Sequence, residues 1–315
     1  AYDRCEGMRV RFAKDKDGTY YQYVVDKEER DIEFVDFSQG TLEEADKVMQ
    51  QWTTVPFPME DAPLTRVVMI SLPDGFNGVY FLGHHMIVDA QSLIGFLKDI
   101  IELYCSQKYE GVPAPKEMAS YIEQIQKDLA YEAGSKAQLR DMEFFQKEIE
   151  SSEPIYNGMK GTDKLEAARQ MFQNPNLRTA FNASGDTTSA LVCLLLMGMR
   201  TYFQKVNGHD DVSINNAIAR RATLKEKKSG GTRIHSFPFR TCFSQDMKFI
   251  DAIYAIRDKQ NEYFRHANYD PTAYFAYRAK TYPQPHAGLT YEPISLTYQP
   301  LTLKEKGLDQ LGDIR

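Results

Sequence analysis

The hydrophobic pattern of the first part of the chain predicts short strands interrupted by two amphipathic helices. Runs rich in β-branched and aromatic residues are separated by turn signals, as expected for strands. Strands are predicted at residues 8–12, 20–25, 32–37, 64–72 and 79–84, and the last two are expected to pair as a hairpin. Apolar residues at helical spacing predict one helix after Thr41, with Glu44 at the capping-box position, and another from Ser92 to Tyr104.

The second part of the chain repeats this mixture of helices and strands. Pro113 and Pro115 mark a linker, after which a long helix is predicted over residues 120–149. Residues 151–186 are polar and without a clear period. Further helices are predicted at 187–203 and 246–264, and strands at 212–219, 236–243 and 289–298. The expected α/β fold has three parts: an N-terminal lobe at 1–115, a long helix and connection at 116–186, and a C-terminal lobe at 187–315.

Composition narrows the classes of protein to which this chain can belong. Its 315 residues, 42% of them hydrophobic, are enough for one large core or two lobes. The net charge of −6 argues against nucleic acid or membrane as a partner, because both attract basic surfaces. The N-terminus does not resemble a signal peptide, and the longest apolar run, residues 190–199, is shorter than the ~20 residues that span a bilayer. We therefore expect a cytoplasmic protein.

Cysteines and histidines do not show the spacing of a metal site. The four cysteines are widely separated, without a Cys-x-x-Cys pair, and are interpreted as reduced cytosolic thiols. The six histidines include no His-Glu-x-x-His sequence. No metal is expected.

Two adjacent histidines at the end of a predicted strand are the strongest candidates for chemistry. His84 and His85 are followed by Asp89 at the start of the next turn. Because neighbouring side chains on a strand point to opposite faces, we interpret His85 as the exposed one. Imidazole exchanges protons near neutral pH, which suits general acid/base catalysis. Spacing alone leaves two questions open. The histidines are either catalytic or purely structural, and Asp89 either orients a histidine or pairs with an arginine.

The residues around these histidines resemble the nonribosomal peptide synthetase condensation domains. His84 to Ala90 read His-His-Met-Ile-Val-Asp-Ala, which is similar to the family motif His-His-x-x-x-Asp-Gly with Ala90 in place of glycine. Arg4 to Phe12 is similar to the family's Arg-His-Glu-x-Leu-Arg-Thr-x-Phe segment. The resemblance implies that the second arginine of this segment, Arg9, pairs with Asp89.

The resemblance continues to about Pro300. Residues 208–212 are similar to the Gly-x-Asp-Asp start of a strand, and residues 291–300 to a later strand of the family. Arg221 matches a family arginine, although Arg220 replaces the glycine before it. Residues 234–240 retain the family's proline and arginine but place His235 where asparagine is usual. That asparagine faces the active-site tunnel in the family, so the resemblance places His235 at the substrate tunnel.

The resemblance implies both a fold and a reaction. The fold is two chloramphenicol-acetyltransferase-like lobes in a V arrangement, with mixed sheets flanked by helices, and the chain is expected to be incomplete at both ends. The reaction joins a carrier-bound acyl or peptidyl thioester to an amine, with His85 as base or as the group that positions the amine. His84, Asp89, Arg9 and Ala90 support the site. No tightly bound cofactor is expected, because the substrates are carried on phosphopantetheine or coenzyme A. The implied partners are peptidyl or acyl carrier proteins and neighbouring synthetase domains.

Three other functions compete with peptide condensation. The first is a free-standing acyltransferase that uses acyl-coenzyme A, and the second is an epimerisation domain that shares the histidine motif. The third is a degenerate domain that only recruits partners, which the departures at Ala90, Arg220 and His235 favour. The intact His85, Asp89 and Arg9 favour an active enzyme.

Overall fold

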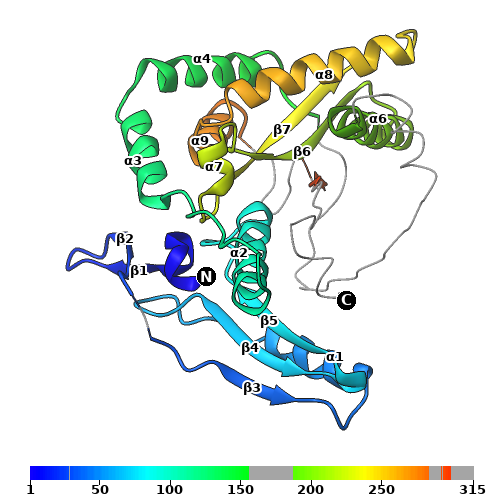
Figure 1. Ribbon diagram of the computed structural model, residues 1–315. Coiled ribbons are helices and arrows are strands. Elements are labelled where there is room, and N and C mark those ends of the chain that lie inside the picture. Colours follow the sequence, from blue (N-terminus) through cyan, green and yellow to red (C-terminus); the bar gives the residue numbers. More distant parts are fainter. Residues whose placement is uncertain (28, 156–186, 284–291, 293, 299–315) are drawn as a thin grey trace. The chain divides into compact units, whose positions relative to one another are not determined.

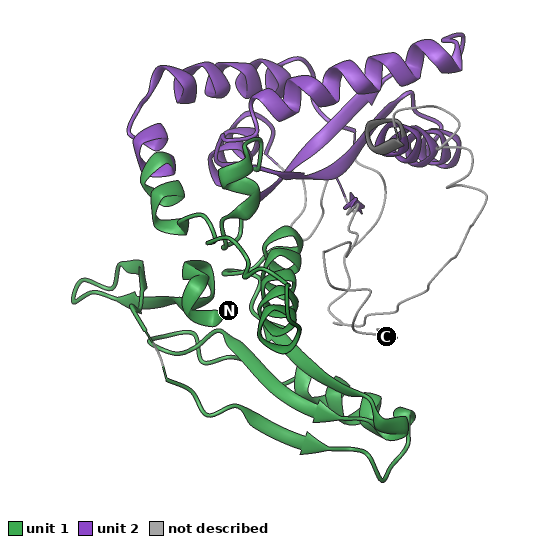
Figure 2. Cartoon of the chain, viewed as in Figure 1, with its two compact units in different colours: residues 1–127, 221–233, 301–315 green, residues 128–220, 234–300 purple. Residues whose placement is uncertain are grey.

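The protein forms two compact units, each built from separate stretches of the sequence (Figures 1 and 2). The computed structural model describes residues 1–27, 29–155, 187–283, 292 and 294–298. Unit 1 contains Ala1–Lys127 and Arg221–Arg233. Unit 2 contains Asp128–Arg220 and Ile234–Pro300. The short stretch Arg221–Arg233 therefore belongs with the N-terminal part of the chain, although the sequence places it among the residues of the C-terminal lobe.

Unit 1 carries two small sheets. In the first, β1 (Val10–Lys14) pairs antiparallel with β2 (Tyr20–Val24). In the second, β4 pairs parallel with β3 and antiparallel with β5, so the sheet is mixed. Its strands are β3 (Glu33–Asp36), β4 (Thr65–Ser71) and β5 (Asn77–Gly83). The register joins Thr65 to Gly83, which confirms the predicted hairpin.

The helices of unit 1 begin at the caps that their sequences provide. The helix α1 (Leu42–Thr53) starts after Thr41, whose side chain forms the expected capping box with Glu44. The helix α2 (Ala90–Lys108) follows β5. The helix α7 (Leu224–Lys228) lies in the Arg221–Arg233 stretch. One cluster of buried side chains combines the first residues of the chain with α2, including Cys5, Met8, Val88 and Phe96.

Unit 2 has a second mixed sheet, in which β6 is the central strand. It pairs antiparallel with β7 and parallel with β8. The strands are β6 (Asp211–Ala219), β7 (Ile234–Cys242) and β8 (Ser295–Leu296). Among the described residues, the helices that lie wholly within this unit are α4 (Lys136–Glu150), α6 (Thr187–Asn207), α8 (Phe249–Arg265) and α9 (Pro271–Thr281).

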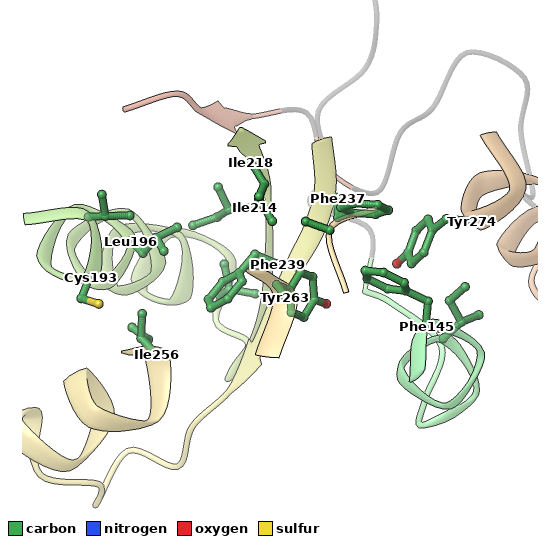
Figure 3. Close-up of a cluster of buried hydrophobic side chains, with 14 of the residues drawn as sticks. Phe145, Cys193, Leu196, Ile214, Ile218, Phe237, Phe239, Ile256, Tyr263 and Tyr274 are labelled. Atoms are coloured by element: carbon green, nitrogen blue, oxygen red, sulfur yellow. The ribbon is translucent and has the colours of Figure 1, made fainter. Parts of the chain in front are cut away.

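The core of unit 2 is rich in aromatic side chains. Figure 3 shows side chains of the sheet strands meeting those of the surrounding helices. Phe145 of α4 stacks on Phe237 of β7 with ring centroids 4.4 Å apart, and Tyr263 of α8 lies edge-on to Phe145 at 5.5 Å. The buried Tyr263 hydroxyl donates a hydrogen bond to the Pro238 carbonyl at 2.9 Å, which satisfies its polar end.

The structure of the second part differs from the prediction at three places. The helix expected over 120–149 is two helices, α3 (Tyr121–Glu132) and α4, because Gly134 has a φ of 88° and Ser135 caps the second one. The helix α9 was not predicted, although Asp270 caps it and Pro271 occupies its first turn. The strand expected at 289–298 is limited to β8 among the described residues, and residues 289–291 and 293 lie outside them.

Candidate active site around His85

The two histidines occupy the turn between β5 and α2 rather than the strand itself. The His84 amide donates to the Leu64 carbonyl at 2.9 Å, and the His84 carbonyl accepts from the Ile87 amide at 3.0 Å. The His84 ring is half-buried and lies edge-on to Phe57, with 6.1 Å between ring centroids, and its Nδ1 accepts from the Met86 amide. His85 is exposed. The turn therefore holds His84 inside the structure and presents the imidazole of His85 to solvent.

Asp89 fixes the other end of this turn. Its side chain is the N-cap of α2, where Oδ1 accepts from the Ser92 amide at 2.8 Å. The same carboxylate pairs with Arg221, whose Nη2 lies 3.1 Å from Oδ1 and 3.0 Å from Oδ2. Both side chains are almost inaccessible, at 3% and 2% exposure. Burial lowers the pKa of the Arg221 guanidinium, and the charge of Asp89 acts in the opposite direction.

The predicted pair between Arg9 and Asp89 is wrong. Arg9 is buried, but its guanidinium donates to the carbonyls of Val25 and Asp26. The reason is local: β1 begins directly after Arg9, and the Val25 amide donates to the Arg9 carbonyl, so this side chain lies beside the end of β2. The arginine that holds Asp89 is instead Arg221, 132 positions away in sequence. The resemblance matched Arg221 to a family arginine but gave it no role.

Residues 221–233, which we call the brace, are wrapped around this ion pair. Arg221 donates to the carbonyls of Glu226, Ser229 and Gly231. The Arg233 amide donates to Oδ2 of Asp89 at 2.9 Å. The backbone of Gly231 forms a parallel bridge with Val88. The brace thus contacts the turn that carries His85 through both side-chain and backbone bonds.

Gly231 is a glycine for a steric reason. Its φ is 80°, and a Cβ at this position would lie 2.0 Å from the ring of Tyr121. Ala90, in contrast, has ordinary helical backbone at the first position of α2. Within the described part of the chain, Asp61 and Asp74 are the non-glycine residues with positive φ. Alanine in place of the family's glycine therefore introduces no backbone strain here.

His235 and Arg220 belong to unit 2. Nδ1 of His235 lies 2.9 Å from the Ala267 carbonyl, and its ring is edge-on to Phe237. Burial and, to a lesser extent, the nearby charge of Arg220 lower the pKa of His235 to about 4. The imidazole is therefore neutral near pH 7. Arg220 itself pairs with Asp128 at 2.8 Å.

Comparison with known proteins decides the family. The model of the family described as "Condensation domain" matches residues 1–273. This chain belongs to the condensation domain family. Surfactin synthase subunit 1 of Bacillus subtilis (strain 168) is 22% identical over 290 residues, which are 89% of this chain and 7% of that protein. Bacitracin synthase 3 of Bacillus licheniformis is 24% identical over 282 residues, covering 85% of this chain and 4% of that protein.

Solved condensation domains share the fold of this one. The first condensation domain of the calcium-dependent antibiotic synthetase matches with a TM-score of 0.72 and 18% identity, over 86% of this chain and 65% of that chain. The starter condensation domain of rhizomide synthetase matches with a TM-score of 0.75 and 16% identity, over 93% of this chain and 66% of that chain. The expected chloramphenicol-acetyltransferase-like α/β fold with mixed sheets is confirmed. This chain spans about two thirds of the solved domains and a small part of each synthetase.

Neither a metal cluster nor a membrane-spanning helix is found in the described part of this condensation domain. No three histidine, cysteine, aspartate or glutamate side chains gather there in a way that would hold a metal ion. No helix in the same residues combines the length and the apolar character needed to cross a bilayer.

Replacing His235 with the asparagine usual in the family should reduce the acid sensitivity of folding. A folded-state pKa of about 4, below the ordinary 6.5, contributes stability that is fully present above pH 6.5 and is lost as pH falls toward 4. At 1.36 kcal/mol per pKa unit, this contribution is about 3 kcal/mol. Urea unfolding of wild type and His235→Asn, followed by circular dichroism at pH 7 and pH 4.5, measures it. An equal loss of unfolding free energy between pH 7 and pH 4.5 in the two proteins would contradict the prediction. NMR titration of the His235 ring in the wild type checks the pKa directly.

Proposed function

We propose that this condensation domain is an acyltransferase that forms an amide bond between a thioester-bound acyl group and an amine. The observation that carries the proposal is the exposed imidazole of His85, held at the end of β5 by the buried Asp89–Arg221 pair. A solvent-facing proton acceptor on a fixed turn is the arrangement that general base catalysis requires. Membership of the condensation domain family supports the same chemistry.

The proposed reaction needs one proton acceptor and a precise orientation of two substrates. The amine nitrogen attacks the thioester carbonyl carbon, so that a C–N bond forms and the C–S bond then breaks. The imidazole of His85 accepts the proton that the amine loses, and the imidazolium so formed returns it to the departing sulfur, which leaves as a thiol. Holding both reactants in line supplies a large part of the acceleration, because the entropy of a bimolecular encounter is removed in advance.

The donor is proposed to arrive on a carrier protein, with phosphopantetheine as the tether. Relatives such as surfactin synthase subunit 1 are much longer than this chain, which supports neighbouring synthetase domains as partners. Coenzyme A carries the same pantetheine thiol, and one of the solved relatives is a starter condensation domain in complex with C8-CoA. The two donor forms are therefore compared directly in the test.

The test is product formation by the full-length protein that contains this domain. The same acyl group is offered on a carrier protein or on coenzyme A, together with a panel of amines and alcohols, and products are identified by mass spectrometry. We expect an amide, formed faster from the carrier-bound donor. An ester formed only from acyl-coenzyme A would instead identify a free-standing acyltransferase. No product from folded protein with either donor would identify a domain without catalytic activity.

A further inference from the structure

One side chain of the brace bonds directly to the residue that carries the proposed chemistry. The Thr232 hydroxyl donates a hydrogen bond to the main-chain carbonyl of His85. We propose that Thr232 is a positioning residue, which fixes the orientation of the His85 imidazole through its backbone. This inference rests on the proposed function, because it assigns the hydroxyl a role in His85-dependent acyl transfer.

Among the described residues, none orients the His85 imidazole directly. Within the described part of the chain, its ring takes part in no hydrogen bond, ion pair or ring contact. The turn is held on both sides, since His84 is bonded to Leu64 and Asp89 is bonded to Arg221. Between these anchors, the peptide that joins His85 to Met86 is held by two hydrogen bonds: its amide donates to Nδ1 of His84 at 3.2 Å, and its carbonyl accepts from the Thr232 hydroxyl. Thr232 is the partner of this peptide that the brace supplies.

Thr232 is itself held firmly enough to act in this way. The residue before it, Gly231, offers its carbonyl to Arg221 at 2.7 Å, and the residue after it, Arg233, donates its amide to Asp89 at 2.9 Å. Both neighbours are therefore tied to the same buried ion pair. A β-branched side chain also has few rotamers, so that the hydroxyl loses little entropy in forming the bond.

The hydroxyl can be removed while the shape of the side chain is kept. Thr232→Val replaces the hydroxyl with a methyl group, and Thr232→Ser retains the hydroxyl without the methyl. For Thr232→Val we expect kcat to fall about tenfold, with KM changed by less than about twofold, because misplacing a catalytic group lowers the rate more than it weakens binding. Thr232→Ser should remain close to wild type.

The matched control is a threonine that makes the same kind of bond elsewhere in unit 1. The exposed Thr54 donates its hydroxyl to the Gln51 carbonyl at 2.8 Å, at the end of α1. Thr54→Val therefore removes a comparable hydrogen bond away from His85. Its kcat and KM should equal those of the wild-type protein.

A second readout does not depend on the proposed function. In protein labelled at histidine, the ring resonances of His85 are identified by their loss in His85→Ala. We expect them to shift or broaden in Thr232→Val but not in Thr232→Ser or Thr54→Val. The proposal would be overturned if Thr232→Val left both kcat and the His85 resonances unchanged. It would also be overturned if Thr232→Val and Thr232→Ser changed kcat and the resonances equally. If the wild type forms no product, the proposed function fails, and the resonances alone then decide whether Thr232 orients His85.

Discussion

Replacing His85 with alanine should lower the rate of amide formation by about 10²- to 10⁴-fold, the range that general base catalysis typically contributes. The imidazole is exposed, and in the described part of the chain its ring takes part in no hydrogen bond, ion pair or ring interaction, so its loss removes proton transfer with little loss of packing. The free energy of unfolding should therefore change by less than about 0.5 kcal/mol, as for other exposed positions. The comparison uses the mass-spectrometric assay under single-turnover conditions, where product release does not hide the chemical step.

His209 provides the control for this substitution. It is also exposed, but it lies in unit 2, between α6 and β6. The rate of His209→Ala should equal that of the wild type. A His85→Ala protein that keeps the wild-type rate would exclude His85 as the proton acceptor. A rate loss in His85→Ala that is explained by a fall in folded protein would likewise count against a chemical role.

Replacing Arg221 with methionine should destabilise unit 1 by about 3–5 kcal/mol, the usual effect of removing one partner of a buried ion pair. The guanidinium is 2% exposed and donates to Asp89 and to three carbonyls of the brace. Without it, the Asp89 carboxylate stays buried without its charged partner, and those carbonyls lose a donor. The turn that carries His85 should then lose its fixed geometry as well.

The only tryptophan of the chain makes this prediction measurable. Trp52 lies in α1 of unit 1 and its ring is edge-on to Tyr80, with 5.0 Å between ring centroids. Its fluorescence during urea unfolding therefore follows this unit. Lys14→Met is the control, because Lys14 lies in the same unit and pairs with Glu60 at an exposed position, and such pairs contribute at most about 1 kcal/mol.

A double substitution separates the ion pair from the other bonds of Arg221. Asparagine also caps helices well, so Asp89→Asn retains the start of α2 while it removes the buried charge. Arg221→Met combined with Asp89→Asn should recover part of the lost stability. Arg9→Met should show no such coupling with Asp89→Asn, because Arg9 bonds to the carbonyls of Val25 and Asp26. Coupling to Arg9 in place of Arg221 would contradict the assignment of the ion pair.

The described part of unit 1 is built from two separate stretches of the sequence, and the Asp89–Arg221 ion pair joins them. The brace returns to the first part of the chain from beyond β6, and the Asp89–Arg221 pair lies at its centre. An ion pair in this position specifies one arrangement of the turn, since each charge is strongly unfavourable when buried without the other. We infer that the motif aspartate serves the site by fixing geometry, while the proton acceptor is His85.

The sequence by itself located the strands of the first part of the chain and the helices α1 and α2, whereas α7 of the brace was not predicted. Hydrophobic periodicity located β4, β5 and α2, and the capping box of α1 was found from Thr41 and Glu44. The same local rules contained signals that were not used: Gly134 and Ser135 divide the predicted long helix, and Asp270 with Pro271 begins α9. These features are encoded within a few neighbouring residues, and for that reason the sequence can specify them.

Only the tertiary structure decided which distant residues complete the site. Arg9 and Arg221 are equally able to pair with a carboxylate, and nothing in their immediate sequence distinguishes them. The choice depends on which side chain the fold brings to Asp89, and the pairing of β1 with β2 takes Arg9 elsewhere. The bond from Thr232 to His85 joins residues 147 positions apart and leaves no periodic signal. Local free-energy preferences determine secondary structure, whereas partners at such separations are selected by the packing of the whole unit.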